Sequence, residues 1–322
     1  MNSSYSSKPL LTIIIPVYNT EKYLAKCLDS IVFQTYQNIE VLVIDDCSTD
    51  NSATIVFEYQ KEHRKIKYYK NDKNMGVGYS RKVASEKAKG DYIAFIDSDD
   101  WVELNYYEIM MKNILEDKCD IAVSGVINEY NNSISAEPRY KIDYHQVIDS
   151  SFALKIMTNY YMQNFYISPN MNNRIYKKSL VNDNNICNDF SKQAQDNYSS
   201  FFAFLYALKV SLVPNTYYHY YQRPGSAVNS FSEEYINNYF NVLKHIKQTL
   251  YDTNQFEKNK DIFMCFTDRS IKWIVSCLIK ANVSNVVQKE CIKLIRSHCL
   301  DLFSANEYID YLDTQRILQL FI

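Results

Sequence analysis

The 322-residue sequence has no run of about 18 consecutive apolar residues, which is the length that a membrane-spanning helix needs. Its apolar run near the N-terminus contains Pro16, with neither a basic segment before it nor a small-residue cleavage site after it. We therefore expect a strand there and not a signal peptide. The sequence also lacks a charge excess, since 35 basic and 37 acidic residues give a net charge of −2. This balance argues against a nucleic-acid-binding surface.

The eight cysteines include no C-x-x-C pair, and no cluster of histidines accompanies them. This spacing argues against a zinc site and against a disulfide framework, and it favours reduced cysteines in the cytoplasm. We find neither an internal repeat nor a low-complexity linker. With 47% apolar residues the chain can bury a sizeable core, and its length fits one large domain or two ordinary ones.

The first 125 residues alternate between short apolar segments and amphipathic ones. The expected strands are LLTIIIPV (10–17), IEVLVIDD (39–46), KIKYY (65–69), DYIAFID (91–97) and CDIAVSGVI (119–127), and the expected helices lie at about 24–32, 48–63, 77–89 and 104–115. This alternation indicates an α/β fold with a mostly parallel, Rossmann-like sheet covered by helices on both faces. Ligands of such sheets bind beyond the carboxyl ends of the strands.

Polar residues end three of these strands, and parallel strands would bring them into one crevice. They are Tyr18 and Asn19, then Asp45 and Asp46, then Asp97, Asp99 and Asp100. Carboxylates so close together repel, so a positive partner is expected. One candidate is a divalent cation that also holds phosphates. The other is a helix N-terminus, because Asp100 and Glu103 match a capping box. We expect capping to account for Asp100 and the cation to account for the other two acids.

Two neighbouring motifs each allow two interpretations. In DDCSTD (45–50), Ser48 or Asp50 suits a helix N-cap, whereas one of the two leading acids can accept the N3–H of a pyrimidine base. In NMGVGYSR (74–81), the Gly-containing turn can bring backbone close to a phosphate, and Arg81 faces either the crevice or solvent.

The alternation ends after about residue 130. We interpret residues 131–145 as an irregular insertion, 172–181 as a strand and turn, and 194–209 as a helix. Residues 210–226 follow as a strand and a basic, Gly-containing turn, and from about residue 231 we expect helices alone.

The segments TIIIPVYNTEKYLAKCLDSIVFQTYQNIEVLVIDDCSTDNS (12–52) and NMGVGYSRKVASEKAKGDYIAFIDSDDWV (74–102) resemble the inverting family 2 glycosyltransferases of GT-A fold, of the bacterial polysaccharide and lipopolysaccharide type. The resemblance covers most of residues 10–125 and weakens toward residue 228. It implies a catalytic domain over 1–228, with a nucleotide-sugar-binding half (1–125) and an acceptor-side half (126–228). A C-terminal helical region (229–322) follows.

The same resemblance implies roles for individual residues. The implied donor-binding residues are Pro16, Tyr18, Glu21, Asp46, Arg81, Asp97, Ser98, Arg223 and Ser226, with Asp46 reading the uracil. Asp99, with Asp97, is the implied ligand of Mn²⁺ or Mg²⁺, and Asp196 of AQDNY is the implied general base. The sequence departs from the family pattern where Gln195 replaces a Glu and where Lys82 and Ala84 replace an Asn and a Gly. These departures bear on the acceptor side of the site more than on donor binding.

Asp196 also stands out from the residues themselves, because it precedes an aromatic helix that can hold it at the crevice. Its alternative role is a helix N-cap. The other later acids, Asp183 and Asp189, lie in an Asn-rich stretch that is typical of turns.

The implied activity is transfer of a sugar from a UDP-linked donor to a hydroxyl of a saccharide or lipid-linked acceptor, in capsule, O-antigen or lipooligosaccharide synthesis. A sugar nucleotidyltransferase would show a Gly-rich basic loop after the first strand, and PVYNTEKYL has none. A non-catalytic nucleotide-sugar-binding subunit is the other alternative, and the joint presence of Asp97, Asp99 and Asp196 argues against it.

We expect the protein in the cytoplasm, with the inner face of the cell membrane as a second location. Residues 269–296 combine basic side chains with Trp273, Ile274 and Leu278, as in a helix that lies on anionic lipid or contacts a second copy. An ordinary helical subdomain that packs on the catalytic core is the favoured alternative.

Overall fold

The computed structural model describes residues 8–130, 133–134, 138–158, 167–187, 194–222, 232–281 and 283–303. The chain divides into two compact units. Unit 1 comprises residues 1–154 and 164–222, and unit 2 comprises residues 155–163 and 223–322. The domain boundary predicted at residue 228 lies outside the described residues.

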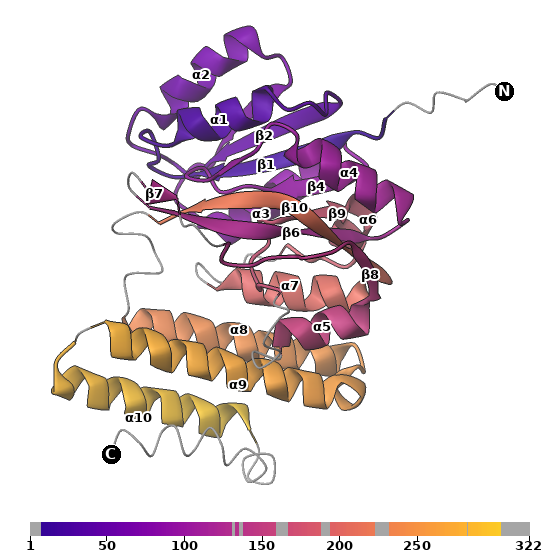
Figure 1. The fold of residues 1–322 in the computed structure, drawn as a ribbon. Coiled ribbons are helices and arrows are strands. Elements are labelled where there is room, and N and C mark those ends of the chain that lie inside the picture. The colour runs from indigo at the N-terminus through magenta and orange to yellow at the C-terminus, as the bar shows by residue number, and fades with distance from the viewer. Residues whose placement is uncertain are drawn as a thin grey trace. The chain divides into compact units, whose positions relative to one another are not determined.

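A mixed sheet forms the centre of unit 1 (Figure 1). Its strands are β1 (Leu11–Val17), β2 (Ile39–Asp45), β3 (Ile66–Lys70), β4 (Tyr92–Phe95), β5 (Trp101–Val102), β6 (Ile121–Tyr130), β7 (Ser133–Ile134), β8 (Gln146–Asp149), β9 (Arg174–Lys177) and β10 (Lys209–Tyr221). The main path runs β3-β2-β1-β4-β9-β6-β10-β5, while β7 pairs with β6 and β8 with β10.

The strand directions confirm the predicted, mostly parallel sheet. β3, β2, β1 and β4 are parallel neighbours. β9 is antiparallel to both β4 and β6, and β10 is parallel to β6, so β6 and β10 share the direction of the first four strands. Every residue of β1 and β2 is buried, as expected for strands that are covered on both faces.

The helices of unit 1 cover the sheet on two sides. They are α1 (Leu24–Val32), α2 (Ser52–Glu62), α3 (Val77–Lys87), α4 (Tyr106–Glu116), α6 (Lys178–Asp183) and α7 (Gln195–Tyr206), with α5 (Ser150–Thr158) at the boundary of the two units. Leu24, Cys27, Leu28 and Ile31 form the buried face of α1, and they share one core cluster with residues of α2 and α4. Figure 1 shows α7 on the opposite side of the sheet from α1 and α2.

The predicted capping box at Asp100 is wrong. Trp101–Val102 form β5, which pairs antiparallel with β10, and α4 begins only at Tyr106 with Asn105 at its N-cap. The backbone after Asp100 is extended because His219 and Tyr218 of β10 offer it a partner strand. Sequence spacing could not reveal that partner, which lies more than 100 residues away.

Unit 2 contains α8 (Glu233–Asp252), α9 (Phe256–Lys280) and α10 (Asn285–Leu302), so the prediction of helices in this region is confirmed for the described residues. The apolar residues that suggested a lipid-facing helix pack inside this unit. Ile274 and Leu278 are buried, and Trp273 donates a hydrogen bond to the Tyr235 hydroxyl at 3.0 Å. Burial of Ile274 and Leu278 removes the apolar surface on which the membrane argument rested, and contact with a membrane or a second copy stays a prediction.

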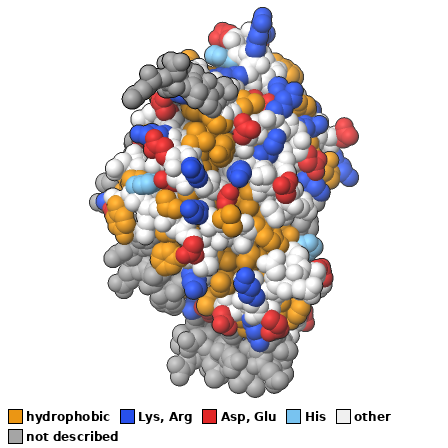
Figure 2. Space-filling model, turned by 90° about the vertical axis from the view of Figure 1, so that its right-hand side faces the viewer, with side chains coloured by type: hydrophobic (Ala, Val, Ile, Leu, Met, Phe, Trp, Pro, Cys, Tyr) orange, Lys and Arg blue, Asp and Glu red, His pale blue; other side chains and the backbone are white. Residues whose placement is uncertain are grey.

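No described helix combines the length and the apolar character that a membrane crossing requires. On the face drawn in Figure 2, basic and acidic side chains are interspersed, and apolar side chains reach the surface in patches between them. All eight cysteines are free, which confirms the expectation of no disulfide framework.

Candidate active site

The polar ends of β1, β2 and β4 lie at one edge of the sheet, as predicted. Val17 pairs with Asp45 across β1 and β2, and Ile14 pairs with Phe95 across β1 and β4, so these strands end close together. The loops beyond them are joined directly, since the Thr20 hydroxyl donates to Ser98 Oγ at 3.0 Å. The segments that follow the three strands therefore form one polar surface.

Asp45 and Asp46 have different roles at this edge. Asp45 is fully buried and accepts hydrogen bonds from Ser48 N (2.7 Å) and from the Tyr68 hydroxyl (2.5 Å). Asp46 accepts from Met75 N (2.8 Å) and from Gly76 N (2.7 Å), which fixes the turn at Gly76. This glycine has φ of 92°, a backbone conformation that side chains disfavour. Asp45 is thus a local structural residue, and Asp46 shapes the loop that leads to α3.

The entry motif of β1 meets the start of α2. Pro16 is buried within β1, whereas the Tyr18 ring is 46% exposed. Glu21 accepts hydrogen bonds from the backbone N–H and the side-chain amide of Asn51, at 2.9 and 2.8 Å. Asn51 precedes α2 but makes no side-chain capping hydrogen bond, whereas Asp50 Oδ1 accepts from Ser52 N, at the start of α2, at 3.0 Å. Of the two predicted capping residues, Asp50 therefore takes this role.

The turn after β4 carries the acidic motif. The N–H of Asp100 donates to the carbonyl of Asp97 at 3.0 Å and closes the turn through Ser98 and Asp99. Asp97 and Asp99 are partly exposed, whereas Ser98 and Asp100 are buried.

Asp100 holds this turn to β10. Its carboxylate accepts from the Tyr218 hydroxyl (2.5 Å) and from Tyr221 N (2.8 Å), and the Tyr218 hydroxyl also accepts from Asp97 N at 3.1 Å. Burial raises the pKa of Asp100 well above its ordinary value, and repulsion from Asp99 adds to the rise. Asp100 is therefore an internal anchor, and Tyr218 is a site residue that sequence reasoning missed.

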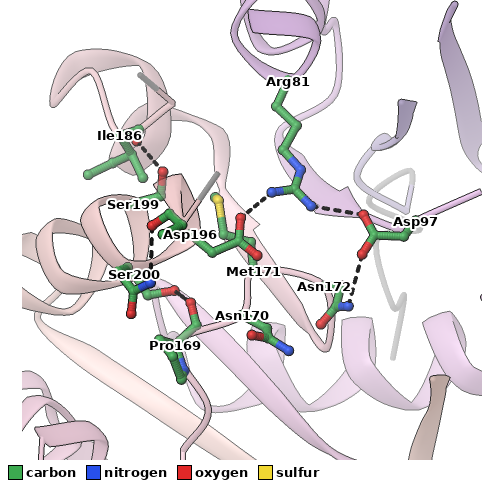
Figure 3. Close-up of polar contacts among 12 residues, drawn as sticks. Arg81, Asp97, Pro169, Asn170, Met171, Asn172, Ile186, Asp196, Ser199 and Ser200 are labelled. Carbon is green, nitrogen blue, oxygen red and sulfur yellow. Dashed lines mark hydrogen bonds and ion pairs between the residues drawn. The ribbon is translucent and has the colours of Figure 1, made fainter. Parts of the chain in front are cut away.

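Arg81 connects the two acids on which the expected chemistry depends (Figure 3). Its buried guanidinium donates to Asp97 Oδ1 at 2.9 Å and, from the other terminal nitrogen, to Asp196 Oδ1. Burial disfavours the charged form, but attraction to Asp196 and Asp97 outweighs it and raises the Arg81 pKa, so this arginine stays a cation. The choice between crevice and solvent is thereby decided in favour of the crevice.

Asp196 lies in the first turn of α7 with its side chain 25% exposed. Its carboxylate bonds to Arg81, and Ala194, not Asp196, is the residue at the N-cap of α7, so the N-cap alternative is wrong. Burial raises the pKa of Asp196, and repulsion from Asp97 acts in the same direction, while Arg81 opposes both. A carboxyl with a raised pKa is a better proton acceptor than an ordinary surface aspartate.

Asn172 is a further site residue that the sequence did not reveal. Its side-chain amide donates to Asp97 Oδ2 at 3.3 Å, so Asp97 has Arg81 on one oxygen and Asn172 on the other (Figure 3). The segment NNRIYKKSLV resembles a later part of the family sequence, but this gave Asn172 no role, because only the folded loop places it beside the turn after β4.

The carboxylates fit a divalent cation that is held together with a phosphate ligand. No group of three or more His, Cys, Asp or Glu side chains in the described part of the chain is arranged to hold a metal by itself. Asp97 and Asp99 nevertheless offer the carboxylate oxygens that Mg²⁺ and Mn²⁺ prefer. Such a cation would complete its coordination from a diphosphate or water. Arg223 and Ser226 of the predicted closing turn lie outside the described residues.

Comparison with known sequences gives one family and several relatives. The profile of "Glycosyl transferase family 2" matches residues 12–193. Glycosyltransferase GlyA of Streptococcus pneumoniae is 33% identical over 235 residues, which cover 70% of this chain and 32% of GlyA. Poly(ribitol-phosphate) beta-N-acetylglucosaminyltransferase TarS of Staphylococcus aureus is 27% identical over 257 residues, which cover 78% of this chain and 42% of TarS. The chain thus spans less than half the length of either relative.

Solved structures confirm the predicted GT-A fold. Residues 1–349 of S. aureus TarS in complex with UDP superpose with a TM-score of 0.67 at 23% identity, covering 88% of this chain and 78% of that one. GalNAc-T7 with UDP, GalNAc and Mn²⁺ superposes with a TM-score of 0.56 at 17% identity, covering 74% and 48%. At these identities the likeness shows the fold alone.

Proposed function

The chain belongs to glycosyl transferase family 2, and from this premise we propose that it transfers a sugar from a UDP-sugar to a hydroxyl of a saccharide or lipid-linked acceptor, with inversion at the anomeric carbon. The observation that carries the proposal is the Asp97–Arg81–Asp196 arrangement. It sets a permanent cation between an acid on the donor side of the sheet edge and an acid at the start of α7.

The sheet edge offers the groups that a nucleoside diphosphate requires. The exposed Tyr18 follows β1 and gives a base an aromatic surface, and Asp46 follows the neighbouring strand β2. The Arg81 guanidinium supplies positive charge for the diphosphate. UDP as the nucleotide is supported by the structures of TarS in complex with UDP and with UDP-GlcNAc.

Asp99 and Asp97 would hold Mn²⁺ or Mg²⁺ against the diphosphate. When bound, the cation supplies positive charge that stabilises the leaving nucleoside diphosphate. The structure of GalNAc-T7, which shares the fold, contains Mn²⁺ together with UDP and GalNAc. Asp100 takes no part in this site, because it is buried and holds the turn to β10 through Tyr218 and Tyr221, whereas Asp97 and Asp99 are partly exposed.

Asp196 would act as the general base. It accepts the proton of the acceptor hydroxyl as the oxygen attacks the anomeric carbon from the face opposite the diphosphate. An α-linked donor sugar then gives a β-linkage. The raised pKa of Asp196, which burial causes first, favours proton acceptance near neutral pH.

The acceptor class is inferred from the relatives. The name of TarS indicates transfer of N-acetylglucosamine to poly(ribitol-phosphate), a polymer that offers hydroxyl groups. We therefore expect a hydroxyl of a cell-surface glycan, polyol polymer or lipid-linked precursor as the acceptor. This chemistry would place the protein in the cytoplasm or at the inner face of the membrane.

The test is a thermal-shift screen of UDP- and GDP-sugars with Mn²⁺, followed by measurement of free UDP in the presence of acceptor saccharides. Stabilisation by a UDP-sugar and acceptor-dependent UDP release are expected. A nucleotidyltransferase would instead release pyrophosphate from UTP and a sugar phosphate, and a binding subunit would be stabilised without releasing UDP. Either result would refute the proposal.

A further inference from the structure

Arg174, in β9, is a charged residue whose burial the proposed chemistry does not explain. Its side chain is completely buried, and within the described ranges it forms no ion pair with a carboxylate. Its Nε has no hydrogen-bond partner there. A buried guanidinium without a carboxylate partner is costly, so the contacts that it does make require an explanation.

Arg174 holds the helix face that begins with Asp196. It donates to Ser200 Oγ at 2.8 Å, and its guanidinium carbon lies 4.6 Å from the centre of the Phe204 ring. Asp196, Ser200 and Phe204 are spaced by four residues, so they lie along one side of α7. The contacts of Arg174 therefore fix the side of the helix that presents the expected base.

The same guanidinium holds the loop that precedes β9. Its second terminal nitrogen donates to the carbonyl of Ser168, and Ser200 Oγ in turn donates to the carbonyl of Pro169 at 2.5 Å. This loop carries Asn172, whose amide bonds to Asp97. Figure 3 shows Pro169 and Asn172 on this loop between Ser200 and Asp97.

We propose that Arg174 is a positioning residue for the transfer reaction, joining α7 and the loop 168–172 so that Asp196 meets Arg81 while Asn172 meets Asp97. Arg174 touches neither expected substrate, so its effect passes through these residues. The inference rests on the proposed role of Asp196 as general base. Attraction to the Arg174 charge also favours the ionised form of Asp196, against the larger effect of burial.

Four variants test the inference. R174M removes the guanidinium, R174K keeps only the charge, and S200A removes one acceptor of Arg174. T12A is the matched control for S200A, because the buried Thr12 hydroxyl also donates one hydrogen bond, to Glu40 at 2.7 Å, and accepts one, from Gly90 N at 2.9 Å. Thr12 lies near the start of β1, away from the carboxyl ends of the strands.

For each variant we would measure kcat and donor KM of UDP release, the calorimetric Kd of UDP with Mn²⁺, and the melting temperature. A misplacement of about 1 Å at the reacting groups costs about 100-fold, so R174M should lower kcat by about that factor while the Kd of UDP stays within about 3-fold. R174K should recover part of the loss, S200A should lose about 10-fold, and T12A should keep kcat within about 2-fold. Folded R174M with near-normal kcat would overturn the inference.

If R174M does not fold, S200A is the test variant. A loss of kcat in S200A no greater than that in T12A would refute the positioning role of Arg174. If the wild type releases no UDP from any donor, the proposed function fails. Hydrogen exchange then tests separately whether Arg174 joins α7 and the loop 168–172. S200A should then raise exchange in both 167–173 and 195–206, and T12A should not. Unchanged exchange in these two segments would overturn the inference independently of catalysis.

Discussion

Replacing Asp196 by Asn tests the centre of the proposed mechanism with a minimal change of shape. Asn keeps the oxygen that accepts from Arg81, and Arg81 also keeps its 2.9 Å contact with Asp97. What disappears is the negative charge and with it the ability to take a proton from an acceptor hydroxyl. A helix cap would tolerate this exchange, whereas a general base would not.

The expected loss of turnover is large. A general base contributes about 10²- to 10⁴-fold, which corresponds to about 3 to 5 kcal/mol of activation barrier. The stability of the folded D196N variant should be unchanged or slightly higher than that of the wild type. Because folding raises the Asp196 pKa, chiefly by burial, ionising this carboxyl at neutral pH makes the folded state less stable relative to the unfolded chain. Asn removes that penalty, so the melting temperature should be unchanged or slightly higher.

The assay is UDP release with donor and acceptor at saturation, together with calorimetry of UDP and thermal unfolding. D120N is the matched control, since Asp120 is a partly exposed aspartate that accepts from Leu208 N at 2.8 Å and lies just before β6, away from the carboxyl ends of the strands. D120N should retain turnover. Near-normal turnover in D196N would refute the assignment and direct the search to Glu103 or to Asp189, which lies outside the described residues.

The remaining predictions concern the turn after β4 and the pH profile. D99A should abolish the response of turnover to added Mn²⁺ after chelation, and an unchanged metal response would exclude Asp99 as a ligand. Y218F should lower the free energy of unfolding by about 1–3 kcal/mol, because buried Asp100 loses a donor. The loss of unfolding free energy in Y218F should become larger as the pH rises through the raised pKa of Asp100, because the ionised carboxylate then lacks its donor. Denaturant unfolding at two pH values measures this, and a loss that does not change with pH would refute the reasoning. Burial, and then repulsion from Asp97, raise the Asp196 pKa, so lowering the pH should reduce turnover at a pH above the ordinary aspartate range. A kcat/KM profile that falls only at the ordinary pKa of an aspartate would contradict this.

The sequence by itself determined the α/β architecture of the first half and the edge at which the site lies. Continuous apolar runs such as LTIIIPV and IEVLVID are typical of strands buried on both faces, and the acids that follow such strands meet where parallel strands end. Asp97 and Asp99 could be singled out for this reason, because both closely follow a predictable strand, whereas for Arg81 the choice between crevice and solvent stayed open. The family resemblance added Asp196.

The tertiary structure alone decided which of these groups touch. Asp100 looked like a helix cap because local spacing cannot register Tyr218, which lies 118 residues further along the chain and forms the buried contact. Arg81 and Asp196 are separated by 115 residues, and their ion pair exists only because α3 and α7 meet beside the same sheet edge. Arg174 gave no signal at all, since a guanidinium in a short strand is usually exposed. Long-range contacts bury such groups and set their charges, and a local pattern carries no information about them.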